Sequence, residues 1–328
     1  MKKSTEKLDE KDRKILVELD KNARQTDSEI AKNTKTSKQV VNYHIQKLIE
    51  KEIISNFYTI IDTGLLGLNT FYVFIQLEKI NKLQEQNILN KIMAQDFVGW
   101  LVDGVGRWDS VILIYADTLT TFSNCLNKII EICGTHLHEY DFTTMIKSEH
   151  INYKFLGDKR VREILQKEKT TATKIDKEDK KLLSFISQNA RASIVEISEK
   201  TRIPIHKAHY HLRKLIKQEI ITGFKPKINV GKLGLQWHLL LIQFHGASEE
   251  RREKFIDFCK QQRNIYYLTS TIGKYNLMLD IHVKDTAEFK EVLLELKENF
   301  SDLIKLYESL VIFDEYKIDY FPAKLIIT

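Results

Sequence analysis

The chain carries one sequence pattern twice, and this duplication limits the folds that it can adopt. Asn22-Ala23-Arg24 reappears as Asn189-Ala190-Arg191, and each matching position lies 167 residues further along the chain. The offset is still 167 at Gly106 and Gly273. Solenoid repeats are about 20–50 residues long, so this longer period indicates a duplicated module with several elements of its own. We therefore expect two copies of one architecture, each performing the same kind of function.

Each copy begins basic and ends acidic. Residues 1–60 contain 13 Lys and Arg against 10 Asp and Glu, whereas residues 61–155 contain 7 against 11. Residues 175–232 contain 13 against 6, and residues 233–328 contain 12 against 15. A phosphate backbone attracts a basic segment and repels an acidic one. The alternation predicts a nucleic-acid-binding domain in each copy, followed by a domain with a different role.

The basic segment has the pattern of a helix-turn-helix. Asp9 is a candidate N-cap ahead of an apolar helical stripe. The capping box Thr26-Asp27-Ser28-Glu29 predicts the start of a second helix, and Ser193-Ile194-Val195-Glu196 stands at the same place in the second copy. A third helix is expected over about 37–51, with an apolar inner face and a polar outer face. This order of helices is typical of proteins that read DNA.

The outer face of the third helix holds the candidate DNA contacts. Gln and Asn can pair with adenine, and Lys can reach guanine or phosphate. A polar outer face is also common in solvated helices, but three helices in this order, basic and present twice, favour nucleic-acid binding. Pro204 replaces Ser37 as the cap in the second copy, where the outer face also differs, so we expect an imperfect palindrome as the binding site. The candidates are Lys38, Gln39, Asn42, Tyr43, Gln46 and Lys47 in the first copy, and His206, Lys207, His209, Tyr210, Arg213 and Lys214 in the second.

The acidic segment predicts a small α/β domain. Strands are expected at 71–77, 98–102, 111–115 and about 140–147, with helices near 82–93 and 118–133 between them. The order β-α-β-β-α-β is the split βαβ pattern, in which helices cover one face of an antiparallel sheet. Such a sheet must cover its other face, and we expect the second copy to provide this cover.

Several motifs occur in a fixed order in the first copy. They are Leu8-Asp9-x-x-Asp12-Arg13-x-Ile15-Leu16, Asn22-Ala23-Arg24, Ile30-Ala31, Ser37, Leu48-x-x-x-x-Ile53-Ile54, Leu66-Gly67 and Gly106-x-x-Asp109. In this order the chain resembles the Lrp/AsnC (feast/famine) transcriptional regulators over nearly its whole length, once per half. The resemblance implies an α+β fold with two copies of a winged helix-turn-helix domain, each followed by a ferredoxin-like βαββαβ domain.

The resemblance also implies partners and a second type of site. Family members bind double-stranded DNA with the first domain and pair through the second, where small effectors, often amino acids, bind near the Gly-x-x-Asp turn. The two halves are therefore expected to form a pseudo-dimer within one chain. Whether such chains assemble further into homo-oligomers is left open. The chain departs from the family pattern in two ways. His44 and His211 stand where the family usually has Arg, and Asn276 stands where the Gly-x-x-Asp turn of the second copy would have its Asp. The implied effector residues are Gly104, Gly106, Arg107, Asp109, Gly273, Lys274 and Asn276.

The expected domain boundaries follow from these patterns. Residues 1–62 and 175–229 are the helix-turn-helix domains, and residues 63–155 and 230–328 are the sensor and dimerisation domains. Residues 156–174 are a charged joint, part helix and part flexible linker. No apolar run is long enough for a bilayer, and three cysteines without a secretion signal argue against disulfides. We expect a cytoplasmic protein with no membrane partner.

Other functions are less favoured by the sequence. Cys125, Cys133, His136 and His138 lack paired metal-ligand spacing, and the second copy has no counterpart of them. Sirohaem decarboxylases are also built from two such modules, but the comparable strands here lack the His- and Arg-rich haem-binding cluster. Gly104-Val105-Gly106 does not open a helix, so it is not a dinucleotide fingerprint. We therefore expect no enzyme activity, cofactor or metal. An architectural DNA-binding protein without effector sensing is the first alternative, and a sirohaem-decarboxylase-like enzyme on the same architecture is the second, less favoured one.

Overall fold

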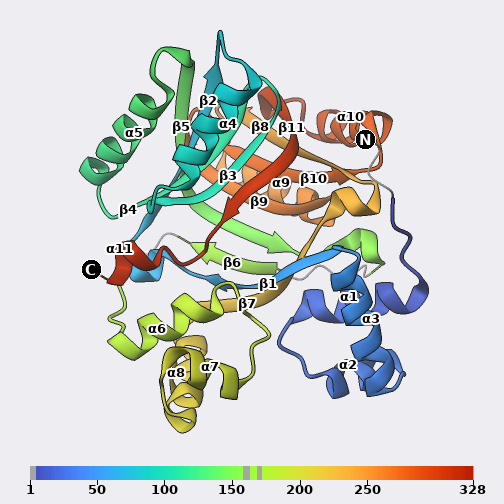
Figure 1. The fold of residues 1–328 in the computed structure, drawn as a ribbon. Coiled ribbons are helices and arrows are strands. Elements are labelled where there is room, and N and C mark those ends of the chain that lie inside the picture. The colour runs from blue at the N-terminus through green and yellow to red at the C-terminus, as the bar shows by residue number, and fades with distance from the viewer. Residues whose placement is uncertain (1–4, 158–162, 168–171, 328) are drawn as a thin grey trace.

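A computed structural model describes residues 5–157, 163–167 and 172–327. Two helical domains lie below a large β-structure, which carries helices on its outer surface (Figure 1). The helix-turn-helix, the βαββαβ order and their repetition, all predicted from the sequence, are confirmed. No helix in the described part of the chain combines the length and apolarity needed to cross a bilayer.

Three helices form each helix-turn-helix domain. The first domain consists of α1 (Glu10–Lys21), α2 (Asp27–Thr34) and α3 (Lys38–Glu50). The second consists of α6 (Lys177–Ile186), α7 (Ile194–Thr201) and α8 (Ile205–Lys217). The predicted capping boxes are present at the starts of both α2 and α7, where they satisfy backbone N–H groups that the helix itself leaves unpaired.

The β-structure is a closed barrel of eight strands, four from each copy. The first copy supplies β2 (Asn69–Leu77), β3 (Val98–Gly106), β4 (Ser110–Ala116) and β5 (Leu137–Ile151), with α4 (Lys82–Met93) and α5 (Leu119–Cys133) outside. The second supplies β8 (Gln236–Phe244), β9 (Ile265–Gly273), β10 (Leu277–Val283) and β11 (Ile304–Ile318), with α9 (Glu249–Gln261) and α10 (Thr286–Phe300) outside. The strand order is β2-β4-β3-β11-β8-β10-β9-β5, and the β2–β5 pairing closes the circle.

Two equivalent seams join the copies. Strand β11 pairs with β3, with Leu310 opposite Gly106, and β5 pairs with β9, with Thr143 opposite Gly273. The second copy therefore does more than cover the open face of the first sheet, because the strands of the two copies also share backbone hydrogen bonds. Closure removes the exposed sheet edges that invite aggregation.

The two helix-turn-helix domains are also joined by backbone pairing. Strand β1 (Ile54–Ile61), which follows α3, pairs antiparallel with β7 (Ile221–Ile228), which follows α8. The apolar core of each helical domain includes residues of the other copy: Ile228 packs in the first core and Ile61 in the second. The halves thus form the expected pseudo-dimer within one chain.

The joint between the copies includes a strand that the sequence did not indicate. In the described part of 156–174, residues Glu163–Lys167 form strand β6, which pairs antiparallel with β5. Residues 158–162 and 168–171 of the joint lie outside the described residues, so the expectation that the joint is part helix and part flexible linker stays a prediction. Strand β5 is long enough to pair with β2 along its first part and with β6 along its last, and this pairing fixes β6. A short helix, α11 (Ala323–Ile327), follows the last strand.

Candidate nucleic-acid interface

The outer face of α3 is exposed and polar, as predicted. Ser37 caps the helix by accepting a hydrogen bond from the Val40 N–H at 3.2 Å, while Val41, Ile45 and Leu48 are buried. Tyr43 is 65% exposed, which is unusual for a large aromatic side chain and favours a contact with a partner. An open groove runs over this face, lined by Lys38, Gln39, Asn42, Tyr43 and Gln46.

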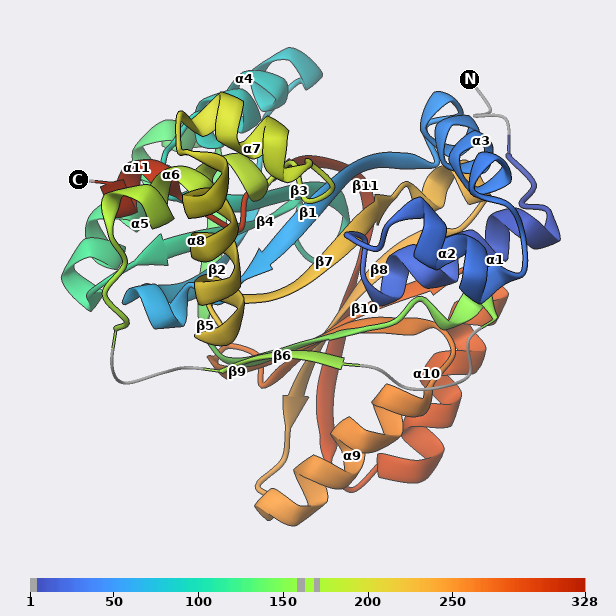
Figure 2. The same ribbon diagram turned by 90° about the horizontal axis from the view of Figure 1, so that it is seen from below.

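The equivalent face of α8 is exposed as well, but its chemistry differs. His206, Lys207, His209, Tyr210 and Arg213 are all exposed. Pro204 supplies no side-chain cap to this helix, as the replacement of Ser37 predicts. The two helical domains that contain α3 and α8 both lie below the barrel in Figure 1, and Figure 2, seen from below, shows α3 and α8 on opposite sides of the view. The chain therefore has two exposed recognition-helix faces of unequal chemistry, called here the reading faces, one on α3 and one on α8.

Two of the predicted DNA contacts, one in each helical domain, form ion pairs inside their domain. The Lys47 ammonium lies 3.0 Å from an Asp9 carboxylate oxygen and 2.9 Å from one of Asp12. Lys214 makes the same pair of contacts with Asp176 and Asp179. These lysines are half-buried and fix the recognition helix to the first helix of its domain, so they differ in setting from the exposed residues of the reading face.

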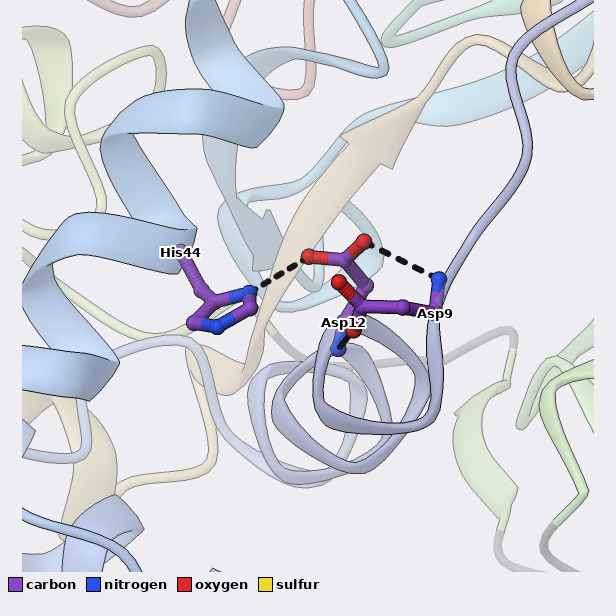
Figure 3. A group of neighbouring side chains, drawn as sticks. All are labelled: Asp9, Asp12 and His44. Carbon is purple, nitrogen blue, oxygen red and sulfur yellow. Dashed lines mark hydrogen bonds and ion pairs between the residues drawn. The ribbon is translucent and has the colours of Figure 1, made fainter.

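The histidines next to these lysines are buried inside their domains. His44 Nδ1 lies 2.7 Å from Asp12 Oδ1 (Figure 3), and His211 Nδ1 lies 2.7 Å from Asp179 Oδ1. Because His44 is only 7% exposed, its ring is not placed to contact a phosphate from the surface. At both positions the chain thus has an internal hydrogen bond, and not a surface cation.

Each of these carboxylate–histidine groups has ligand atoms close enough for a metal ion. The ligand atoms of Asp9, Asp12 and His44 lie within 4.8 Å of one another. However, the Lys47 ammonium already contacts both carboxylates, so it supplies the positive charge that a metal would bring. Cys133 and His136, weighed above as ligands, do not belong to any such group among the described residues.

Two equivalent arginines lock the helical domains together. Arg24 Nη1 donates to the carbonyls of Ala190 and Ala192, at 2.6 and 3.0 Å. Arg191 Nη1 donates in return to the carbonyl of Gln25 at 3.1 Å, and its Nη2 lies 2.8 Å from Asp27 Oδ1. Burial lowers the pKa of both guanidinium groups, and each stays ionised because an arginine pKa is so high. These contacts fix the relative orientation of the reading faces.

The turns implied as effector sites have internal partners. Asp109 accepts a hydrogen bond from the Leu77 N–H at 2.6 Å, and Asn276 accepts one from the Phe244 N–H at 2.8 Å. Asn276 of the second copy therefore keeps the hydrogen-bond acceptor that Asp109 provides in the first copy. Arg107 pairs with Glu139.

The remaining turn residues lie along the two seams. Lys274 Nζ lies 3.3 Å from a carboxylate oxygen of Asp141. A Cβ atom at Gly104 or Gly106 would lie 2.2 or 2.1 Å from a carbonyl oxygen of β11. Gly273 has a φ of +133° and makes a similarly close approach to Phe142. The glycines permit the strands to meet, and an effector contact at these turns stays a prediction.

A cavity inside the barrel was not anticipated from the sequence. It measures about 100 Å³ and is lined by residues of both copies, among them Trp100, Trp237, Asp280 and His282. One feature of the sequence could have indicated it. Asp280 and His282 stand two residues apart in the apolar run of strand β10 and so share one face of the strand. Buried polar groups on one face of a core strand indicate either an internal network or a ligand site.

The geometry defines a protein with two helix-turn-helix domains mounted on one barrel that both copies build. A family model for winged helix-turn-helix DNA-binding domains matches residues 8–55 and again residues 175–222. The HTH-type transcriptional regulator Ptr1 of Methanocaldococcus jannaschii is 32% identical over 121 residues, which cover 37% of this chain and 80% of Ptr1. The regulator LysM of Saccharolobus solfataricus is 27% identical over 127 residues, 39% of this chain and 87% of LysM. The chain belongs to the Lrp/AsnC family of transcriptional regulators, present as a tandem duplication.

A solved structure shares the duplicated architecture. The sirohaem decarboxylase NirDL matches 97% of this chain and 98% of its own, with a TM-score of 0.63 and 14% sequence identity. This likeness shows the fold alone. The regulator relatives and the helix-turn-helix matches identify the present chain as a transcriptional regulator that binds DNA.

Proposed function

We propose that the chain is a sequence-specific regulator which binds one imperfect palindrome with both recognition helices, and that a small effector modulates this binding. The observation that supports the proposal is the pair of exposed, chemically unequal reading faces held in a single two-fold arrangement. Dimeric helix-turn-helix proteins read half-sites about one helical turn, roughly 34 Å, apart. Here the two helix-turn-helix domains belong to one chain, so binding does not require two subunits to assemble.

The unequal faces predict unequal half-sites. Gln39 and Asn42 on α3 can each pair with adenine, whereas Arg213 on α8 can pair with guanine. Asn42 Nδ2 also donates to Asp27 Oδ2 at 3.2 Å, which orients the amide on the outer face. Exposed lysines such as Lys38 contribute phosphate contacts that position the protein without reading sequence.

Selection from a genomic fragment library at physiological salt, followed by sequencing, tests specificity. Recovery of one motif with two dissimilar half-sites supports the proposal. Uniform recovery supports the architectural alternative, since phosphate contacts alone carry no sequence preference. A motif with two identical half-sites contradicts the inequality of the two heads.

Variants then assign each half-site to a helix. Gln39→Ala should weaken binding by about 1–3 kcal/mol when the first half-site is intact, and it should relax the base preference there. His206→Ala should act at the other half-site only. Lys128→Ala, an exposed residue on α5 of the barrel, is the matched control and should leave binding unchanged.

We also propose that the chain acts as a regulator and not as a sirohaem decarboxylase. A uroporphyrin-type tetrapyrrole carries many carboxylates, which need cationic partners. The barrel cavity is lined by Asp280, Glu315 and Asp319, and Lys227, the one lysine or arginine among its described lining residues, is paired with Glu315. Titration of the protein with sirohaem tests this: a shifted haem absorbance band together with loss of carboxyl groups would contradict the proposal.

A further inference from the structure

The barrel cavity lies between the sensor strands and the DNA-binding domains. Its walls include Tyr72 of β2 and Met278 of β10, and also Tyr58 of β1 and Ile228 of β7. Strands β1 and β7 form the ribbon that directly follows the two recognition helices. A molecule in the cavity would therefore touch both the barrel and the β1–β7 ribbon, to which the two recognition helices are directly joined.

Aromatic side chains dominate the cavity wall. Nine of its twenty-two lining residues are Tyr or Trp. The Trp100 and Trp237 rings lie 6.2 Å apart at an angle of 40°, and the Tyr153 and Tyr266 rings are stacked 5.1 Å apart. The electron-rich faces of such rings attract a cation, most strongly where water is excluded.

The charged groups of the wall are mainly acidic. Asp280 is 5% exposed and accepts a hydrogen bond from Trp237 Nε1 at 2.7 Å. Among the described residues no basic side chain forms an ion pair with Asp280. The Lys227 ammonium lies 2.6 Å from a carboxylate oxygen of Glu315, so this ion pair already neutralises its charge. Asp319 adds a third carboxyl group to the lining.

Two buried histidines complete the polar lining. His150 and His282 are 5% and 3% exposed. Nε2 of His150 and Nδ1 of His282 have no hydrogen-bond partner among the described residues. Burial lowers the pKa of both imidazoles to about 3, helped at His150 by the charge of Lys225, so both rings are neutral. Neutral rings do not attract an anion, and each can accept a hydrogen bond from an N–H donor.

We propose that this cavity binds a small organic cation: a primary amine or quaternary ammonium with an apolar body and no carboxylate. The aromatic wall receives the apolar body and the positive charge, and Asp280 is the counter-ion. An amino acid fits less well, because its carboxylate would compete with Glu315 for Lys227. An anionic ligand would face three carboxyl groups and no unpaired lysine or arginine among the described lining residues.

Occupation of the cavity has a direct route to DNA binding. A ligand that favours one position of the β1–β7 ribbon shifts the relative orientation of α3 and α8 by as much as its affinities for the two states differ. This regulatory consequence rests on the proposed function. Binding of the cation does not rest on it, so the two are measured separately.

Calorimetry on the full chain without DNA tests the ligand class. The probes are phenethylamine, phenyltrimethylammonium and 3-methylbutylamine, with 2-phenylethanol, 3-phenylpropionate and phenylalanine as neutral, anionic and zwitterionic counterparts. At least one cation should bind at one site per chain, about tenfold or more tighter than the neutral alcohol. Failure of all three cations, or tighter binding of the acid or the amino acid, would overturn the proposal.

A variant locates the site. Asp280→Asn keeps an acceptor for Trp237 but removes the charge, and it should reduce cation affinity about tenfold while leaving the alcohol unchanged. Glu131→Gln, on the exposed surface of α5, is the matched control for loss of one carboxylate. Unchanged cation affinity in a folded Asp280→Asn protein, checked by circular dichroism, would overturn the assignment. DNA binding measured with and without the bound cation then reports on regulation alone.

Discussion

Trp108 and Tyr275 occupy equivalent positions in the two copies, and their side chains meet inside the barrel, where Trp108 Nε1 donates to Tyr275 Oη at 2.6 Å. Both side chains are fully buried. Two tryptophans at this point would bring two donors together with no acceptor, because an indole N–H can only donate. The difference between the copies therefore solves a hydrogen-bonding problem that a symmetric dimer would meet at this contact. The Tyr275 hydroxyl in turn donates a hydrogen bond to the Glu308 carboxylate.

Tyr275→Phe should lower the free energy of unfolding by about 1–3 kcal/mol, because it leaves the buried Trp108 N–H without an acceptor. Urea denaturation followed by tryptophan fluorescence measures the change. Tyr140→Phe, where the side chain is 43% exposed, is the control and should change stability by less than about 0.5 kcal/mol. Equal effects of the two substitutions would show that the internal hydrogen bond does not matter.

Arg24→Ala should destabilise the joint between the helical domains by about 1.5–3 kcal/mol, since a charged donor to two carbonyls is lost. It should also weaken binding to the complete DNA site more than binding to an isolated half-site, because the relative orientation of the heads is no longer fixed. Urea denaturation and fluorescence anisotropy measure the two effects. Arg13→Ala, exposed on α1, controls for loss of a positive charge. A uniform loss on all DNA would instead point to a direct phosphate contact of Arg24.

Local patterns predicted the helical domains well for a physical reason. A capping box such as Thr26–Glu29 is complete within four residues, so the sequence contains the whole interaction. The β-α-β-β-α-β order is similarly readable from short apolar periods. Lys47 shows where this reasoning ends: it stands on a polar helix face, but its partner Asp9 lies 38 residues earlier and draws the side chain inward.

The barrel closure and its cavity depend on contacts that no local pattern contains. Gly106 lies opposite Leu310 of the other copy, and only that close approach explains why a side chain is excluded there. Strand β6 forms because β5 extends beyond its partner β2, a length that the sequence did not show. Asp280 was overlooked because a single acidic residue in an apolar strand does not reveal what the opposite wall contains.

Acid should destabilise the helical domains as the capping carboxylates titrate. Burial opposes ionisation of Asp9, but the Asp12 N–H and the Lys47 ammonium outweigh it and lower the pKa to about 2; Asp176 is lowered to about 2 in the same way. Because the folded pKa lies below the usual 3.8, this contribution is complete above about pH 4 and is lost as the pH falls towards 2.

The double variant Asp9→Asn and Asp176→Asn should show a smaller loss of stability between pH 4 and pH 2 than the parent chain. Both carboxylates are about half-exposed, so solvent screening limits the effect to about 1 kcal/mol or less per site. Thermal unfolding across this pH range measures it. An identical acid dependence in parent and variant would mean that these pairs contribute nothing to the acid transition.

Asp280 should have the opposite pH dependence. Burial raises the pKa of this carboxyl to about 7; the Trp237 hydrogen bond opposes the rise and the charge of Glu315 adds to it. Between about pH 4 and pH 7 the folded chain holds a proton that the unfolded chain has lost, so the free energy of unfolding falls as the pH rises through this window and then levels off. Asp280→Asn removes this cost and should be more stable than the parent above pH 7, by at most on the order of 4 kcal/mol. Urea denaturation of both proteins at pH 5 and pH 8 measures the difference, with Glu131→Gln as the exposed control. A gain that is the same at both pH values would show that Asp280 is ionised throughout, and a bound or internal cation would then have to neutralise it.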